Sequence, residues 1–208
     1  MAIELSDLVD PSHTALVTQE AQRGVIGDRA ALPMLADAAR ESGATDRMGE
    51  LAAAARAAGV QVVHCVAKRR PDLKGGNTNA RLFTAMAKVP DAILEGTDAV
   101  EVVPEIGTDP ADLVLSRYHG LGPMGGTDLD AVLRNLGIRT VVGIGVSVNI
   151  GMLDFAFDAV NAGYQFVLPR DAVAGFPPEY AEAVIDNTLA LVATVTTTAE
   201  IIDVWRKA

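Results

Sequence analysis

Short runs of β-branched and other apolar residues alternate with stretches of helical spacing along almost the whole chain. The apolar runs are nearly continuous and are bounded by Gly, Pro or charged residues, a pattern typical of strands buried on both faces. We expect strands at 13–19, 60–67, 112–117, 140–146 and 165–171. We expect helices at 29–42, 47–58, 127–136, 150–162 and 179–193, then a tail with a short strand and a helix ending near Trp205. This alternation predicts an α/β fold with three α/β/α layers around a mostly parallel, doubly wound sheet.

The predicted sheet also says where a site should lie. In a doubly wound sheet, ligands bind beyond the carboxyl ends of the strands, at the point where the strand order reverses. The positions to search therefore follow directly after Gln19, Ala67, Arg117, Val146 and Asp171. The segment 68–108 is less regular, and we interpret it as an excursion that could cover the site.

Length and charge exclude several classes of protein. A chain of 208 residues fits one domain spanning 1–208. Its formal charge of −10 disfavours nucleic acid and anionic lipid as partners, because binding either needs clustered Lys and Arg. No run approaches the roughly 18 apolar residues of a membrane span. The N-terminus has neither the basic nor the apolar segment of a secretory signal, so we expect a cytoplasmic protein with no membrane partner.

Cysteine and histidine are too few for a disulfide framework or a histidine-rich metal centre. The single cysteine, Cys65, lies in the middle of an apolar run, which favours a small buried hydrophobe over a nucleophile. The three histidines are widely spaced. We therefore expect no metal and no cofactor, and a small molecule as the partner.

A glycine-rich turn at 143–151 joins a predicted strand to a predicted helix. It is not a dinucleotide fingerprint, because Val148 stands where the third glycine would be needed. It is not a serine nucleophile elbow either, since no histidine follows Ser147 in the chain. Two interpretations remain open: backbone N–H groups that attract an anion or oxyanion, or a plain turn with Ser147 or Asn149 as N-cap.

Two charged residues end predicted strands. Glu20 follows the first strand, and burial there would raise its pKa and suit it to donate a proton, although a surface carboxylate is the alternative. Arg117 ends the third strand and could pair with Glu20 or bind a substrate carboxylate. His119 lies two positions further on and could titrate near neutral pH or be structural.

As an ordered set, these positions resemble the isochorismatase-like family of hydrolases, which includes nicotinamidases and other amidases. The family opens with an A-L-[LV]-x-x-D-x-Q strand, here residues 15–22 with Glu20 and Gln22. A lysine ends its third strand, and G-V-x-[TS]-x-x-C-V follows its fourth; here Arg117 and residues 145–152 correspond. Further matches are Gly126–Leu129, Asp158–Ala159, Gly163–Tyr164 and Asp171–Ala172.

The resemblance implies an altered active site. The family's Asp, Lys and Cys triad is replaced by Glu20, Arg117 and Gly151, so thioester chemistry is impossible at that last position. The isochorismatases proper also carry glycine there and hydrolyse a vinyl ether with the carboxylate as general acid. By this resemblance, Glu20, Arg117 and Gly151 are the candidate catalytic positions, and the candidate substrate-binding residues are Gln22, His119, Ser147 and Asn149.

Two functions therefore remain open from the sequence. One is a cofactor-independent hydrolase of a small anionic, polar or amide-like metabolite. The other is a catalytically silent member of the family that binds a ligand or partner, with Glu20 and Arg117 as a structural ion pair. The resemblance also implies a homo-oligomer, either a dimer or a tetramer.

Overall fold

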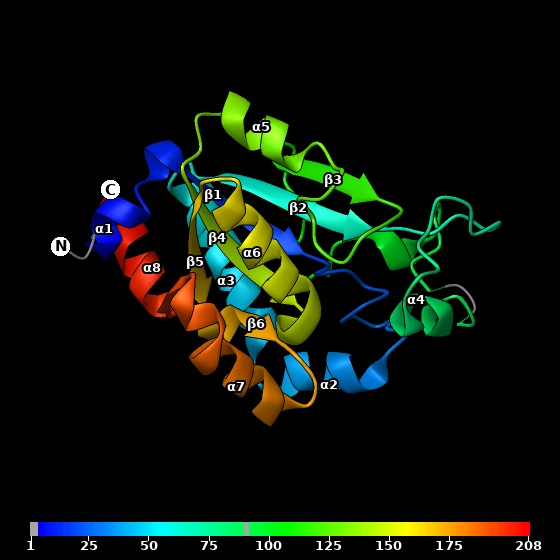
Figure 1. Cartoon of the computed structure of the whole chain (residues 1–208). Coiled ribbons are helices and arrows are strands. Elements are labelled where there is room, and N and C mark those ends of the chain that lie inside the picture. The colour runs from blue at the N-terminus through cyan, green and yellow to red at the C-terminus, as the bar shows by residue number, and fades with distance from the viewer. Residues whose placement is uncertain (1–3, 90–91) are drawn as a thin grey trace.

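A parallel sheet whose strand order reverses once organises the chain (Figure 1). The computed structural model describes residues 4–89 and 92–208. In this part of the chain the strand order is β3-β2-β1-β4-β5-β7, with β6 beside β4, and every strand pair is parallel. The strands are β1 (Thr14–Gln19), β2 (Gln61–Ala67), β3 (Leu113–Arg117), β4 (Thr140–Val146), β5 (Gln165–Pro169), β6 (Val173–Ala174) and β7 (Thr194–Thr196). The order reverses between β1 and β4, and the predicted α/β fold is confirmed.

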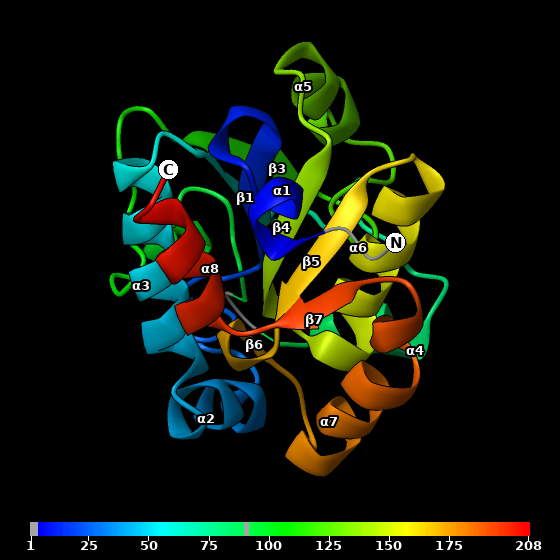
Figure 2. The same ribbon diagram turned by 90° about the vertical axis from the view of Figure 1, so that its left-hand side faces the viewer.

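Helices cover both faces of this sheet (Figure 2). On one face lie α1 (Leu5–Leu8), α2 (Pro33–Glu41), α3 (Ala44–Ala57) and α8 (Thr198–Trp205). On the other lie α5 (Leu129–Asn135), α6 (Leu153–Asn161) and α7 (Pro178–Asn187). The six-residue helix α4 (Arg81–Met86) lies apart from both, in the excursion that follows β2.

The central strands are enclosed on both faces. All residues of β1 and β4 are buried. On one side of the sheet Met48 and Leu51 of α3 pack over them, and on the other side Phe155 packs edge-on against Phe166, with ring centroids 5.0 Å apart. Groups placed at the carboxyl ends of β1 and β4 are therefore held by two fully buried strands.

Most element predictions are close to the structure, and the differences have local causes. The helix expected at 29–42 begins only at Pro33, which suits the first turn of a helix. The strand expected at 165–171 ends at Pro169, where a 3-10 turn over Arg170–Ala172 begins. β3 was expected to be buried on both faces, but it is an edge strand, and Val114 is 55% exposed.

The tail packs onto the body of the molecule. Trp205 is 3% exposed, and its indole N–H donates to the backbone oxygen of Val9 at 2.8 Å. This hydrogen bond joins α8 to the segment after α1, so the tryptophan fastens the two ends of the described chain together. In residues 4–89 and 92–208, no helix is long and apolar enough to cross a membrane.

Candidate active site

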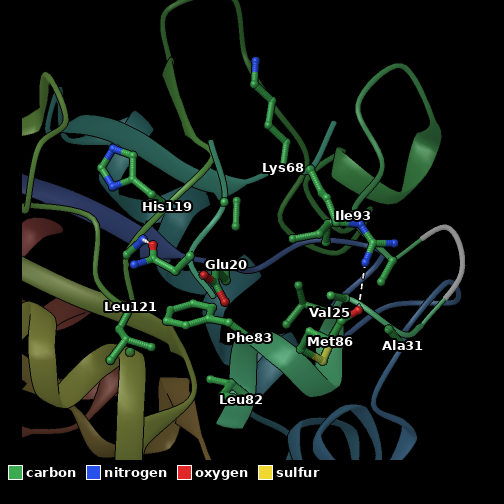
Figure 3. A pocket seen from close by; sticks show the side chains of 18 of the residues that line it. Glu20, Val25, Ala31, Lys68, Leu82, Phe83, Met86, Ile93, His119 and Leu121 are labelled. Carbon is green, nitrogen blue, oxygen red and sulfur yellow. Dashed lines mark hydrogen bonds between the residues drawn. The ribbon is translucent and has the colours of Figure 1, made fainter. Parts of the chain in front are cut away.

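A cavity of about 260 Å³ opens at the carboxyl edge of the sheet, where the strand order reverses. Its floor carries Glu20 after β1 together with Ser147 and Gly151 after β4. Residues of the excursion within 68–87 and 92–93, including α4, supply much of its wall (Figure 3). The site thus lies where the topology predicts, and part of the irregular segment covers it as expected from the sequence.

Glu20 leaves the end of β1 in an unusual backbone conformation. Its φ is 51°, in the left-handed region that non-glycine residues seldom adopt and that is enriched at functional sites. The backbone N–H of Glu20 still donates to the Cys65 oxygen at 3.0 Å, so the turn begins immediately after the strand ladder. Its side chain is 24% exposed and is directed into the cavity (Figure 3).

Arg117, at the end of β3, is the counter-ion of Glu20. Its Nη2 donates to Glu20 Oε1 and, at 3.1 Å, to the backbone oxygen of Leu121. The Arg117 side chain is only 3% exposed. Of the two roles open from the sequence, pairing with Glu20 is the one that the geometry shows, because the guanidinium lies behind the carboxylate rather than in the cavity wall.

Burial raises the pKa of the Glu20 carboxyl above its ordinary value, and the charge and hydrogen bond of Arg117 oppose that rise. The carboxyl therefore holds a proton to a higher pH than a solvated glutamate. Once the Glu20 carboxyl has lost its proton, the resulting carboxylate lies beside the guanidinium of Arg117. This is the electrostatic setting of a group that donates a proton and then needs its anion stabilised.

The turn after β4 is a short π-helical segment, Val148–Met152, that runs into α6. The N–H groups of Ile150 and Met152 both donate to the backbone oxygen of Ser147, at 3.1 and 3.0 Å. These two amides are therefore already engaged, which reduces the set of donors that the turn could offer to an anion.

A buried glutamine fills the space beside Gly151. The Gln19 side chain is fully buried, and its Nε2 donates to the Leu121 oxygen at 3.0 Å, the same oxygen that Arg117 binds. A Cβ at Gly151 would lie 2.8 Å from this Nε2 and 3.2 Å from the Leu121 oxygen. Sequence reasoning missed Gln19, although a glutamine in an otherwise apolar buried strand was the signal that could have found it.

This contact predicts an energetic coupling between Gln19 and Gly151. We expect Gly151→Ala to destabilise the protein by about 1–3 kcal/mol, because the added methyl group overlaps a side chain held in a fixed hydrogen bond. In a Gln19→Ala background the same change should cost at least about 0.5 kcal/mol less. Urea unfolding of the four proteins measures this cycle. If the free-energy losses of the two single variants simply add in the double variant, Gln19 does not limit the space at Gly151.

The other predicted site residues divide into two groups. Ser147 and His119 line the cavity, but the His119 ring packs against Gly126 and points away from Glu20 (Figure 3). Asn149 lies outside the cavity lining, where its Oδ1 accepts from Ser147 Oγ at 3.2 Å. Gln22 is fully buried and lies outside the cavity lining. Its Nε2 donates to the backbone oxygen of Ala67 and its Oε1 accepts from the backbone N–H of Ala67, both at 2.8 Å. Gln22 therefore ties β1 to β2 instead of facing a ligand.

The one cysteine of the chain lies outside the cavity lining. Cys65 is 3% exposed within β2 and is not part of the cavity lining, and burial raises the pKa of its thiol to about 12. In residues 4–89 and 92–208, no group of three or more His, Cys, Asp or Glu side chains is placed to hold a metal ion.

Comparisons with known proteins agree with this architecture. The sequence profile described as "Isochorismatase domain" matches residues 14–200. The chain is 36% identical over 106 residues to the uncharacterized isochorismatase family protein YwoC of Bacillus subtilis, a match covering 51% of this chain and 56% of YwoC. It is 27% identical over 187 residues to the ureidoacrylate amidohydrolase RutB of Agrobacterium fabrum, covering 83% of this chain and 80% of RutB.

A solved structure shows the same fold. The cysteine hydrolase from Pseudomonas syringae superposes with a TM-score of 0.80 at 22% identity, over 96% of this chain and 95% of that one. The profile match covers most of the chain and includes both the end of β1 and the turn after β4, which build the site. The chain belongs to the isochorismatase family of hydrolases.

Proposed function

We propose that the protein hydrolyses a vinyl-ether or related bond of a small molecule by proton transfer from Glu20, without a covalent nucleophile. The observation that carries this proposal is the carboxyl of Glu20 directed into the cavity with Arg117 behind it and glycine at position 151. A proton donor, a stabilising cation and a cavity for the substrate are the parts that such a reaction needs.

In the proposed reaction, the Glu20 carboxyl donates its proton to the terminal carbon of the alkene. The ether-bearing carbon becomes an oxocarbenium ion, and water adds to it. The resulting hemiacetal loses its alcohol and leaves a carbonyl compound. The attacking water returns a proton to the Glu20 carboxylate, so the enzyme is restored and one water is consumed per bond broken.

Arg117 acts as a positioning residue in this scheme. It holds the Glu20 carboxyl by Oε1 and stabilises the carboxylate after proton transfer. Its second hydrogen bond, to the Leu121 oxygen, fixes the loop that follows β3 against the same site. Loss of this cation should therefore disturb both the orientation of the acid and its pKa.

Amide hydrolysis through a thioester is a poorer fit to the site. The names of RutB and of the Pseudomonas syringae protein describe an amidohydrolase and a cysteine hydrolase. This chain has one cysteine, and it lies within β2, outside the cavity lining. The acid-assisted reaction uses the Glu20 carboxyl at the cavity and the Arg117 cation behind it.

A second function is favoured by the burial of the ion pair itself. Arg117 and Glu20 could serve only to hold β1 to β3 in a catalytically silent protein that binds a ligand.

The two functions differ in whether the protein turns over a substrate. Release of pyruvate from isochorismate and of acetaldehyde from cyclohexyl vinyl ether should be measured with wild type and Glu20→Gln side by side. Faster release of either product by wild type supports the hydrolase; equal rates at the uncatalysed level support the silent protein.

A further inference from the structure

We propose that the cavity binds an uncharged, largely apolar molecule and presents the one polar part of that molecule to Glu20. The proposal deepens the proposed function, on which the identity of the polar part rests. It replaces the expectation of an anionic or polar metabolite with a different substrate class, on three observations: the walls, the cations and the size of the cavity.

The walls are apolar where the excursion faces the sheet. Leu82, Phe83 and Met86 of α4 line the cavity together with Val25 and Ile93 (Figure 3). No residue of α4 is buried, and Leu82 is 36% exposed. The apolar side chains of this helix therefore keep their surface facing the cavity, and a ligand that covered them would remove that surface from water.

Two cations beside the cavity contact other groups of the protein. The guanidinium of Arg69 donates to the backbone oxygens of Met86 and Val89, at 2.8 and 2.7 Å, and so holds α4 in place. Lys68 Nζ lies 4.8 Å from the centroid of the Tyr118 ring, and its side chain extends away from Glu20 (Figure 3).

Behind the floor, Nη2 of Arg117 binds Glu20 and the Leu121 oxygen. The Nε and Nη1 atoms of Arg117 have no hydrogen-bond partner among the described residues, but they are buried and Arg117 is not part of the cavity lining. A substrate carboxylate near the reacting bond would therefore lose its hydration beside the Glu20 carboxyl without gaining an ion pair there.

The size of the cavity limits the ligand further. Its volume of about 260 Å³ is slightly below the roughly 300–1,000 Å³ typical of sites for drug-sized molecules. A single six-membered ring carrying a short ether suits this volume. Cyclohexyl ethyl ether is an unreactive probe of that class, and cyclohexyloxyacetate is its counterpart with a carboxylate.

Isothermal titration calorimetry of the full chain with these two ethers tests the proposal. We expect the uncharged ether to bind at least about tenfold more tightly than the carboxylate, because only the carboxylate must be desolvated without an ion pair. Equal or tighter binding of the carboxylate would overturn the proposal, and so would failure of both ethers to bind. If tight carboxylate binding is lost in Lys68→Met, the cavity is an anion site that uses Lys68.

A matched pair of variants locates the binding. Met86→Gln keeps the shape of the side chain and the backbone oxygen that Arg69 binds, and should weaken the uncharged ether by about fivefold through the polar group it places in the wall. Met34→Gln makes the same change on α2 at a residue that is 56% exposed and outside the cavity lining, and should have no effect. An unchanged affinity in Met86→Gln would contradict the assignment to this cavity.

Neither ether contains an alkene, so their binding does not depend on turnover. Binding of the uncharged ether with no hydrolysis of cyclohexyl vinyl ether would leave the substrate class standing and reject the proposed reaction. Hydrolysis that favours a carboxylate-bearing vinyl ether would support the proposed reaction and reject the uncharged substrate class.

Discussion

Glu20→Gln is expected to lower kcat/KM by about a thousandfold, since general acid catalysis typically contributes about 10²–10⁴. Glutamine keeps the hydrogen-bonding shape of the protonated carboxyl but has no proton to give. Below the raised pKa of Glu20 its carboxyl is already uncharged, so at such a pH the melting temperature should stay unchanged or rise slightly. Product release and a thermal melt on the same preparations give both readouts.

A second variant separates the acid from its position. Glu20→Asp restores the family's usual carboxylate but withdraws it by about 1 Å, which can cost about a hundredfold in rate. Turnover in wild type should also fall as pH rises through the raised pKa of Glu20, because only the protonated form donates. Near wild-type turnover in Glu20→Gln would remove Glu20 as the proton donor. A clear fall in its melting temperature, with no turnover in wild type, would instead favour the structural ion pair.

Arg117→Met is expected to destabilise the protein by about 3 kcal/mol at pH 8, because it leaves a buried carboxylate without its cation. The loss should depend on pH. Without Arg117 the pKa of Glu20 rises further, so between its ordinary value of 4.5 and the raised value the folded state binds more protons than the unfolded state. Stability therefore falls as pH rises through that window. Urea unfolding of wild type and Arg117→Met should show a small loss of unfolding free energy in the variant at about pH 4 and the full loss at about pH 8.

The double variant Glu20→Gln/Arg117→Met is the control for this prediction. It removes both charges, so most of the stability lost at pH 8 should return and the pH dependence should disappear. A loss in Arg117→Met that is the same at both pH values, and that the double variant does not recover, would assign the effect to lost packing and to the lost Leu121 hydrogen bond.

The fold could be predicted because the sequence pattern and the topology rule agree. Nearly continuous apolar runs marked the fully buried strands β1 and β4. The rule that ligands bind where strand order reverses then placed Glu20 and the 147–151 turn together, as the structure does. The pattern was a poorer guide at the edge of the sheet, where β3 has one face open and alternates between partly buried and exposed residues up to the buried Arg117.

The site was predictable only in part, because much of it depends on contacts between residues far apart in the sequence. Glu20 and Arg117 could be paired from their positions at strand ends. The hydrogen bond of Gln19 to Leu121 spans 102 residues and has no local sequence signal beyond a polar residue in a buried strand. The apolar wall from α4 was not predicted, because a six-residue helix with no buried face leaves too short a pattern to recognise.

The most direct test of acid-assisted hydrolysis is mass spectrometry of the products released from isochorismate and cyclohexyl vinyl ether by wild type in D₂O. If Glu20 donates to carbon, the pyruvate or acetaldehyde released will carry one deuterium on its methyl carbon, and Glu20→Gln will release none above the uncatalysed rate. Incubating the finished product with each protein controls for exchange after release. Enzymatic product without that deuterium, or no hydrolysis of either substrate by wild type, would contradict the proposed reaction.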